Sequence, residues 1–221
     1  MRGPRLKLLL AASGLIALAS LLLLLLTAPS GDHRALLGEA RRRVLNSTGW
    51  RFVESVNCSD SFALVTGNVS LKEHRLWTSV TVLPKTGAPQ AYFFYANKTA
   101  SFVSLEGAWV RSGGGWRVEE TVLVRLLELA SQAQEVYVRR SNAEVRLLFN
   151  GTCSSECTAL FNSIATLAGS RVESPAQVSG SVVLIGGAPR SVFSVFRGTS
   201  GFCAVNYTVF EFNAEIEVRG P

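Results

Sequence analysis

Leu76-Trp77-Thr78-Ser79-Val80-Thr81-Val82 and Ala91-Tyr92-Phe93-Phe94-Tyr95 are the two stretches that decide the fold class. β-Branched and aromatic side chains dominate both stretches, and this composition is typical of β-strands. The connection between them runs from Pro84 to Pro89 and is short. Strands joined by short turns are antiparallel, so we predict an antiparallel pair here.

Stretches with the same character continue on both sides of this pair. Turn residues such as Gly113-Gly114-Gly115 and Gly186-Gly187 separate them. Further strands are expected at 51–56, 63–71, 100–105, 108–111, 135–140, 144–149, 178–185, 191–197 and 202–218. The last of these is long, and we expect it to be bent or bulged.

Three segments instead repeat their apolar residues at helical spacing. The first begins after Asp32 and ends near Gly49, the second follows Glu119-Glu120, and the third lies between Ser154 and Gly169. Their apolar stripes contain Leu36, Leu37, Ala40 and Val44, then Val122, Leu123, Leu126, Leu127 and Ala130, then Leu160, Phe161, Ile164, Ala165 and Ala168. Because the helices come in separate blocks and do not alternate with strands, the predicted class is α+β.

Residues 1–31 predict where the chain is located. Arg2, Arg5 and Lys7 precede an uncharged run that includes six consecutive leucines. About 20 apolar residues are enough to cross a bilayer as a helix, and the basic flank is expected to stay in the cytoplasm. We interpret 1–31 as an uncleaved signal anchor and 32–221 as one extracellular domain of a single-pass cell-membrane protein. A cleaved signal peptide is the alternative.

Six of the nine asparagines stand in Asn-x-Ser/Thr sequons. A sequon permits N-glycosylation, so this enrichment suggests a glycosylated surface outside a eukaryotic or archaeal cell, and we favour an archaeal one. The alternative is that these asparagines are ordinary turn residues. The acceptor positions are Asn46, Asn57, Asn68, Asn97, Asn150 and Asn206.

The chain has four cysteines, and an even number in an exported chain favours two disulfides. Three pairings are open, and we favour Cys153 with Cys157, four residues apart at the start of a helix, and Cys58 with Cys203. A zinc site is the rival interpretation. It lacks a third ligand at a recognisable spacing, since the only histidines are His33 and His74.

Charge and motif content argue against several functional classes. The formal net charge is +6, but without Arg2, Arg5 and Lys7 there are 19 basic residues against 16 acidic ones, too even a balance to indicate nucleic-acid binding. The sequence has no Gly-x-Ser-x-Gly elbow and no phosphate-binding loop. The Glu119-Glu120 doublet suits the positive end of a helix. We predict no enzyme activity, no catalytic residue, no metal site and no cofactor.

Several predicted strands are apolar on both faces. Phe93 and Tyr95 alternate with Tyr92 and Phe94, and the same holds at 182–185 and 192–196. An antiparallel sheet with one wet face should alternate more cleanly. This indicates either an apolar ligand between sheet and helices, a partner on the remaining face, or strands covered on both sides in an ordinary core.

The order of the elements, together with several short stretches, resembles a known family. The stretches are Gly49-Trp50-Arg51-Phe52, Gly67-Asn68-Val69, Tyr95-Ala96-Asn97-Lys98, Gly107-Ala108-Trp109-Val110 with Trp116, and 210–221. Over about 33–220 the chain resembles the lipoprotein-localisation-factor-like (LolA-like) proteins, including the LppX-type lipid-binding lipoproteins. The resemblance lies in element order and hydrophobic type, not in a diagnostic motif.

The resemblance implies a strongly curved antiparallel sheet, an incomplete barrel, with about three helices on its concave side. Family members hold acyl chains or other amphiphiles in the apolar space between the two layers, and no catalytic residue comes with the resemblance. This chain departs from the family because no cysteine follows the hydrophobic segment to carry a lipid anchor. A transmembrane helix takes that place here, which puts a shuttle role in doubt.

Two functions are therefore expected. The first is a membrane-tethered extracellular domain that binds a lipid or other amphiphile, and the second is a structural or protein-interaction subunit of the cell envelope with no small ligand. The candidate lining residues for the first are Phe93, Tyr95, Leu126, Leu127, Phe161, Ile164, Val183 and Phe193.

Overall fold

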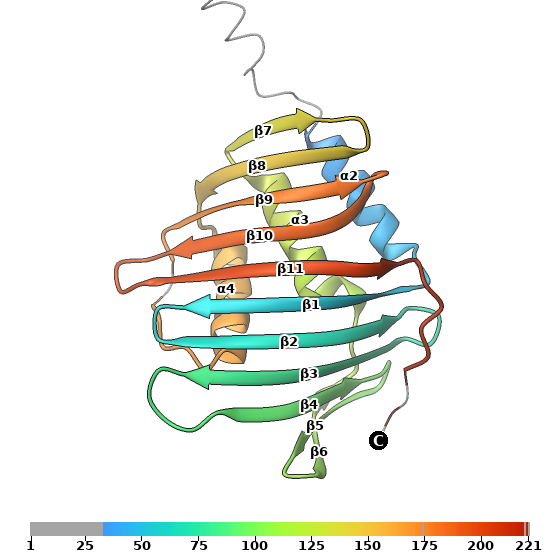
Figure 1. Cartoon of the computed structure of the whole chain (residues 1–221), viewed down its shortest axis with the longest axis vertical. Coiled ribbons are helices and arrows are strands. Elements are labelled where there is room, and N and C mark those ends of the chain that lie inside the picture. The colour runs from blue at the N-terminus through green and yellow to red at the C-terminus, as the bar shows by residue number, and fades with distance from the viewer. Residues whose placement is uncertain (1–32, 174, 219, 221) are drawn as a thin grey trace, which may run out of the picture.

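Antiparallel strands form one 11-stranded sheet in the order β6-β5-β4-β3-β2-β1-β11-β10-β9-β8-β7 (Figure 1). The computed structural model describes residues 33–173, 175–218 and 220. The strands are β1 (Gly49–Cys58), β2 (Ser61–Ser70), β3 (Arg75–Pro84), β4 (Gln90–Ala96), β5 (Ala100–Leu105), β6 (Ala108–Gly114), β7 (Glu135–Arg140), β8 (Glu144–Thr152), β9 (Gln177–Ile185), β10 (Ala188–Arg197) and β11 (Phe202–Phe212). Strands β6 and β7 are free edges, so the sheet is not a closed barrel.

The sheet consists of two meanders that meet at its middle. Strands β1 to β6 form one meander and β7 to β11 the other, and they join where β1 pairs with β11. The register between these strands sets Glu54 opposite Tyr207 and Cys58 opposite Cys203. A register shift between Arg51 and Phe52 marks an irregularity in the same pair. The first and last strands of the domain therefore lie side by side at the centre.

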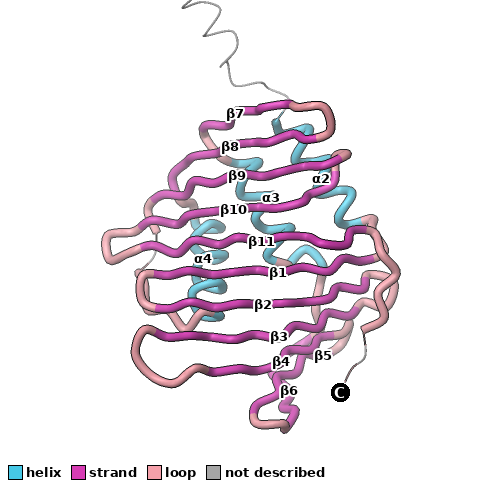
Figure 2. Tube along the Cα trace, in the orientation of Figure 1, coloured by secondary structure: helices cyan, strands magenta, loops and turns pink. Residues whose placement is uncertain are grey.

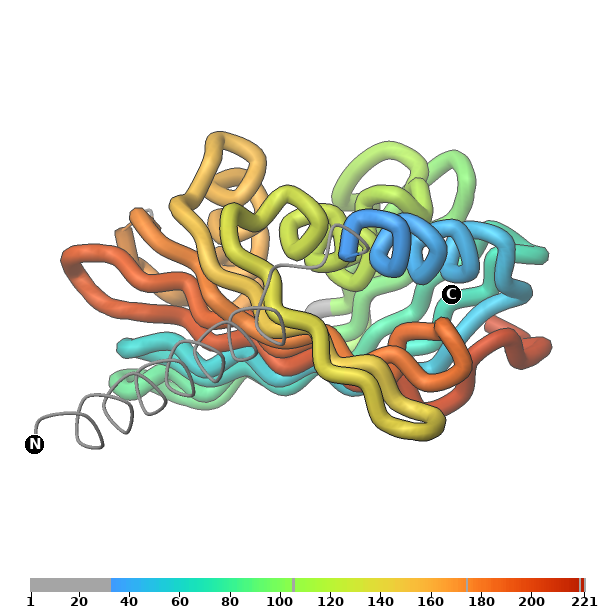
Figure 3. Tube along the Cα trace, turned by 90° about the horizontal axis from the view of Figure 1, so that it is seen from above, coloured from blue at the N-terminus to red at the C-terminus, as the bar shows by residue number. Residues whose placement is uncertain are grey.

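Three α-helices lie on one face of the curved sheet in the described part of the chain (Figures 2 and 3). They are α2 (His33–Leu45), α3 (Val122–Gln132) and α4 (Ser155–Leu167), and the short 3₁₀ helix η1 (Val118–Glu120) leads into α3. We call the helix-covered face of the sheet the inner face and the opposite one the outer face. The α+β prediction is confirmed, and the curved, open sheet is the one that the family resemblance implied.

The apolar stripes predicted from helical spacing form the core between helices and sheet. Leu37, Ala40 and Val44 of α2 are buried, as are Leu123, Leu126 and Leu127 of α3. Burying one such aliphatic side chain stabilises a fold by roughly 1.5–3 kcal/mol. Because all three helices cover the same face, this gain is concentrated on the inner side of the sheet.

Helix α4 begins and ends at the residues that the sequence predicts. The Ser154 hydroxyl accepts a hydrogen bond from the Cys157 backbone N–H at 3.3 Å, which satisfies one of the free N–H groups of the first turn. At the other end Gly169 has φ +64°, a left-handed conformation that favours glycine after a helix. These two residues fix where α4 begins and ends.

Both favoured disulfides are present. Cys58 and Cys203 are bonded across the β1–β11 pair, and Cys153 and Cys157 are bonded at the start of α4. The first bond joins the two meanders at the point where their strands meet. The second holds the entry of α4 to the end of β8.

The last strand is shorter than predicted. We expected a strand at 202–218, but β11 ends at Phe212, and Asn213 follows with φ 59°. Its side chain accepts a hydrogen bond from the Thr48 backbone N–H at 3.0 Å. Beyond this turn, Ile216 and Val218 pack against Tyr95 on the outer face. The alternating apolar residues of this tail therefore cover a sheet without joining it.

The expected signal anchor at 1–31 and the expected helix cap at Asp32 lie outside the described residues. Among the residues that the structure describes, none of the helices has the length and apolar content needed to cross a bilayer.

Candidate binding pocket

A cavity of about 470 Å³ lies between the inner face of the sheet and the helical layer. Its size falls in the range of roughly 300–1,000 Å³ that is typical of small-molecule sites. We call it the sheet–helix pocket. It is lined by Phe52, Glu54, Val65, Val69, Leu76, Thr78, Val80, Tyr92, Phe94, Trp116, Glu120, Thr121, Val122, Ser163, Leu167 and Tyr207.

The sheet side of the pocket comes from alternate residues of neighbouring strands. Side chains two positions apart on a strand point to the same face, so β1 contributes Phe52 and Glu54 and β4 contributes Tyr92 and Phe94. Strands β2, β3 and β11 add the aliphatic and aromatic groups between them. The resulting floor is apolar, with Glu54 as its one carboxyl group.

The opposite wall comes from the segment around η1 and from α4. Trp116 precedes η1, Val122 begins α3, and Ser163 and Leu167 lie on the C-terminal half of α4. Ser163 is exposed, whereas Leu167 is half-buried. The pocket is therefore partly open to solvent beside α4.

Glu54 is the unusual group in this pocket. It is 2% exposed, and its Oε1 atom has no hydrogen-bond partner among the described residues. Burial raises the pKa of the Glu54 carboxyl to about 7, since the charged form loses its hydration. A buried carboxyl oxygen without a protein partner is rare in a folded chain, so Glu54 Oε1 is a candidate contact for a ligand.

The aromatic groups beside Glu54 hold one another in place. The Trp50 indole Nε1–H donates a hydrogen bond of 2.9 Å to the Tyr207 hydroxyl, and the Phe52 ring stacks on the Tyr207 ring at 4.6 Å. Burial raises the pKa of the Tyr207 hydroxyl well above its usual value, so this group stays neutral. These contacts give the pocket floor a fixed shape.

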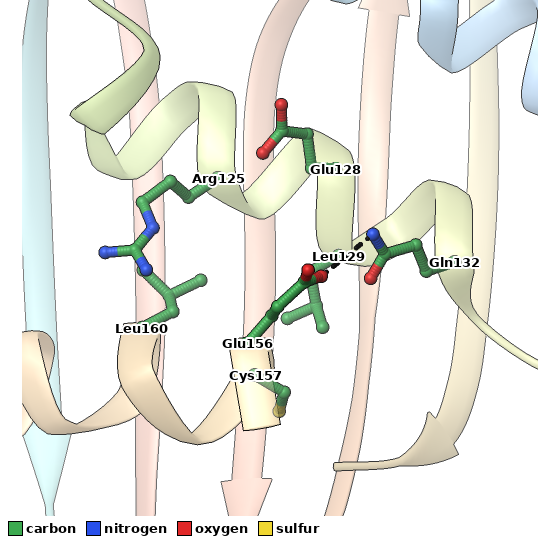
Figure 4. Close-up of a pocket in the computed structure, with 7 residues that line it drawn as sticks. All are labelled: Arg125, Glu128, Leu129, Gln132, Glu156, Cys157 and Leu160. Atoms are coloured by element: carbon green, nitrogen blue, oxygen red, sulfur yellow. Dashed lines mark hydrogen bonds between the residues drawn. The ribbon is translucent and has the colours of Figure 1, made fainter. Parts of the chain in front are cut away.

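A second pocket, the interhelix pocket, is a different kind of site. Its volume is about 410 Å³, and it lies between α3 and α4 (Figure 4). Arg125, Glu128, Gln132 and Glu156 line it, and Gln132 Nε2 donates a hydrogen bond of 3.1 Å to Glu156 Oε2. Glu128 also accepts from Arg41 at 2.7 Å. Leu129, Cys157 and Leu160 complete its lining, so charged and polar groups make up more than half of the residues around it.

The described residues hold no metal centre. No group of three or more His, Cys, Asp or Glu side chains is placed to bind an ion in the part of the chain that the structure describes.

None of the eight predicted lining residues lines the sheet–helix pocket. On the strands, Phe93 and Phe193 are exposed and Val183 is half-buried, all three on the outer face, while Tyr95 is buried there beneath the C-terminal tail. The predicted strand residues and the pocket-lining residues belong to two alternating sets, and both sets are apolar. On β4 the pocket is lined by Tyr92 and Phe94, and not by the predicted Phe93 and Tyr95.

The four predicted helical residues point inward but do not line the pocket. Leu126, Leu127, Phe161 and Ile164 are fully buried in the core between helices and sheet. The prediction identified the buried stripe correctly, but helical spacing does not tell a packed core position from a cavity wall.

Sequence reasoning missed Glu54 and Tyr207. A signal for Glu54 is present, because Phe52 and Val56 flank it on the same face of a predicted strand. A carboxylate in the middle of an apolar face is costly, and such a residue is a candidate for function. Tyr207 has no comparable local signal, since it faces Glu54 only through strand pairing.

The predicted glycosylation sites lie mostly on exposed positions. Asn46, Asn57, Asn150 and Asn206 are exposed, and Asn68 and Asn97 are half-buried. The Asn97 side-chain oxygen also accepts hydrogen bonds from Thr99 and Ala100. Exposure at the first four positions leaves room for a glycan.

Two solved structures are similar to this chain over most of its length. LprF from Mycobacterium bovis matches with a TM-score of 0.57 and 13% identity, covering 87% of this chain and 98% of that one. The chain shares the LprF fold. LppX, a lipoprotein of Mycobacterium tuberculosis, matches with a TM-score of 0.50 and 12% identity, covering 86% of this chain and 100% of that one.

Sequence comparison adds no relative. No protein-family model matches the chain, and no curated protein matches it. The similarity to LprF and LppX therefore supports the LolA/LppX-like architecture, at sequence identities where only the fold is shared.

Proposed function

We propose that this chain is a membrane-tethered extracellular domain that holds a lipid or other amphiphile in the sheet–helix pocket. The observation that carries the proposal is a cavity of about 470 Å³ whose lining, taken as a whole, is mainly apolar. Such a cavity between two layers is a favourable place for hydrocarbon, since each ligand methylene that leaves water gains about 0.8 kcal/mol. The fold shared with LprF and LppX adds support, because LolA-like proteins bind amphiphiles at this position.

The location is part of the proposal. Residues 1–31 serve as the tether, and the domain faces the outside of the cell, which we take to be archaeal. Two disulfides support this placement, because such bonds persist in oxidising compartments. The exposed sequons at Asn46, Asn57, Asn150 and Asn206 are also consistent with it. Binding, not catalysis, is the proposed activity.

Native mass spectrometry of the full chain, extracted from its own host membrane, tests this function. We expect a mass above that of the protein and its glycans, and the excess should disappear when the chain is unfolded. A mass equal to that of the protein with its glycans alone would contradict the proposal.

A matched pair of variants places the ligand. Ser163 lines the sheet–helix pocket and Asn162 does not, although both are exposed on α4. Ser163→Trp should block the opening and lower the bound lipid fraction, whereas Asn162→Trp should leave it unchanged. Equal loss in both variants would place the ligand elsewhere.

The alternative function is an envelope subunit that binds another protein through its outer face. The observation that favours it is a set of exposed apolar side chains there, among them Phe93, Phe193 and Phe210. Exposed apolar patches often mark interaction surfaces. A co-purifying protein that is lost in Phe193→Ser, together with a lipid-free mass, would favour this alternative.

A further inference from the structure

The pocket-lining residues carry acidic groups but no basic ones. Glu54 and Glu120 are the carboxyl groups among the described lining residues, and Tyr92 and Tyr207 are the other titratable groups. No Lys, Arg or His lines this cavity in the described part of the chain. An anionic ligand head would therefore find no counter-charge inside it, and would lie near a carboxylate.

Glu54 has a free acceptor position at the floor of the pocket. Its cross-strand neighbours are Val65 on β2 and Tyr207 on β11. Val65 has no polar side-chain atom, and the Tyr207 hydroxyl accepts from Trp50 while making no hydrogen bond to Glu54 Oε1. The folded chain thus buries a carboxyl oxygen at a cavity wall and leaves it without a donor.

We propose that the ligand of the sheet–helix pocket carries a hydrogen-bond donor, a hydroxyl or a protonated amine, that binds Glu54. This inference rests on the proposed function and specifies the chemistry of the ligand head. The hydrocarbon of the ligand lies against Phe52, Val65 and Val80, and the donor reaches the Glu54 carboxyl oxygen. Anionic heads, such as a carboxylate or a phosphate monoester, are disfavoured.

The donor requirement follows from the chemistry of the carboxyl group. Above its pKa of about 7 the Glu54 carboxyl is ionised and only accepts hydrogen bonds, and it binds a charged donor more strongly than a neutral one. A ligand that brings only hydrocarbon would leave Glu54 buried and unpaired, which is the costly arrangement. A ligand that brings a donor satisfies it, so occupancy and head chemistry are linked.

Four twelve-carbon probes of matched chain, dodecanol, dodecylamine, dodecyl methyl ether and dodecanoate, test the head preference. Each competes with the fluorescent apolar dye N-phenyl-1-naphthylamine for the full-length protein in non-ionic micelles at about pH 8.5, where the Glu54 carboxyl is ionised. We expect dodecanol and dodecylamine to bind about tenfold more tightly than the ether and dodecanoate, the effect of one buried hydrogen bond to a charged group.

Three variants assign the preference to Glu54. Glu54→Leu should bind the ether at least as well as the parent does and lose the preference for donors. Glu54→Gln should keep the alcohol preference, since its amide oxygen accepts, and lose the additional affinity for the amine. Ser194→Ala is the control, because Ser194 Oγ is also buried without a partner but does not line the pocket. It should behave as the parent does.

The outcomes separate the two proposals. If none of the probes displaces the dye from the parent, or the dye does not bind, the proposed function fails and this inference fails with it. If all four probes bind with equal affinity, and Glu54→Leu changes none of them, the pocket binds amphiphiles but Glu54 does not select the head. Tighter binding of dodecanoate than of dodecanol would overturn the inference directly.

Discussion

Glu54 on β1 and Tyr207 on β11 lie directly opposite each other on paired strands, and both side chains are 2% exposed. These strands are the first and the last of the domain, and they meet at the centre of the sheet. The floor of the pocket is thus built where the two meanders join. A site at this position forms only when both halves of the chain are in place.

The buried carboxyl of Glu54 predicts that stability falls as pH rises. Its pKa is about 7 in the folded protein, against 4.5 for an ordinary glutamate. Below about pH 4.5 the group is protonated in both states, and between about 4.5 and 7 only the unfolded state releases the proton. The free energy of unfolding should therefore drop through this window, by about 3 kcal/mol in total.

Glu54→Gln provides the measurement for this pH effect. Gln is neutral at every pH, so the variant should unfold at higher urea than the parent at about pH 8 and lose the advantage near pH 4. Urea titrations of both proteins across this range give the difference directly. A constant difference between parent and variant at all pH values would show that Glu54 does not titrate between the two states.

Tyr207→Phe should destabilise the domain by about 1–3 kcal/mol, because it leaves the buried Trp50 N–H without its acceptor. Tyr137→Phe removes a hydroxyl from an exposed tyrosine on β7 and should change stability by about 0.5 kcal/mol or less. Chemical denaturation measures both.

The double variant Trp50→Phe with Tyr207→Phe should lose less stability than the sum of the two single changes, since no buried donor is then left without an acceptor. Strict additivity would argue that the hydrogen bond contributes little.

The two disulfides should contribute unequally. Cys58 and Cys203 are separated by 145 residues, and Cys153 and Cys157 by 4. Closing a longer loop removes more entropy from the unfolded chain, so replacing the first pair by alanine should cost about 5 kcal/mol and the second about 2 kcal/mol. Urea unfolding of the two double-alanine variants compares them. A larger loss from the Cys153–Cys157 pair would mean that native packing at α4 dominates over loop entropy.

Much of the fold was predictable because its signals are local. Ser154 and Gly169 mark the ends of α4, and the apolar stripe of α3 follows from helical spacing alone. The end of β11 was not predictable from the pattern, because Ile216 and Val218 continue the alternation while packing on the outer face. Apolar alternation reports which residues are buried, and it does not distinguish a paired strand from an extended tail.

The pocket was harder to predict than the fold. Phe93 and Phe193 are as apolar as the residues on the inner face, so alternation alone left two equivalent choices. Phe94 is half-buried and Phe93 is exposed because α3 and α4 cover the inner face, and which face they cover is a property of the assembled layers. Glu54 is a charged residue, and it belongs to only one of the two alternating sets of β1. It therefore distinguishes the two faces, and the floor of the pocket could have been located from it.

Gly67 predicts a direct test of the space beneath Phe52. A Cβ atom at this position on β2 would lie 2.9 Å from Thr78 Cγ2 and closer still to the Phe52 ring, and both neighbours line the pocket. Gly67→Ala should therefore push Phe52 into the cavity, destabilise the domain by about 1–3 kcal/mol and weaken binding of an apolar dye.

Gly38→Ala is the matched control, since Gly38 is an exposed residue of α2 with open space around it. That change should stabilise the domain by about 0.5–1 kcal/mol through helix propensity and leave dye binding unaltered. If Gly67→Ala lowered stability without affecting the dye, Phe52 would have to relax away from the cavity, and the dye would bind without contacting this part of the floor.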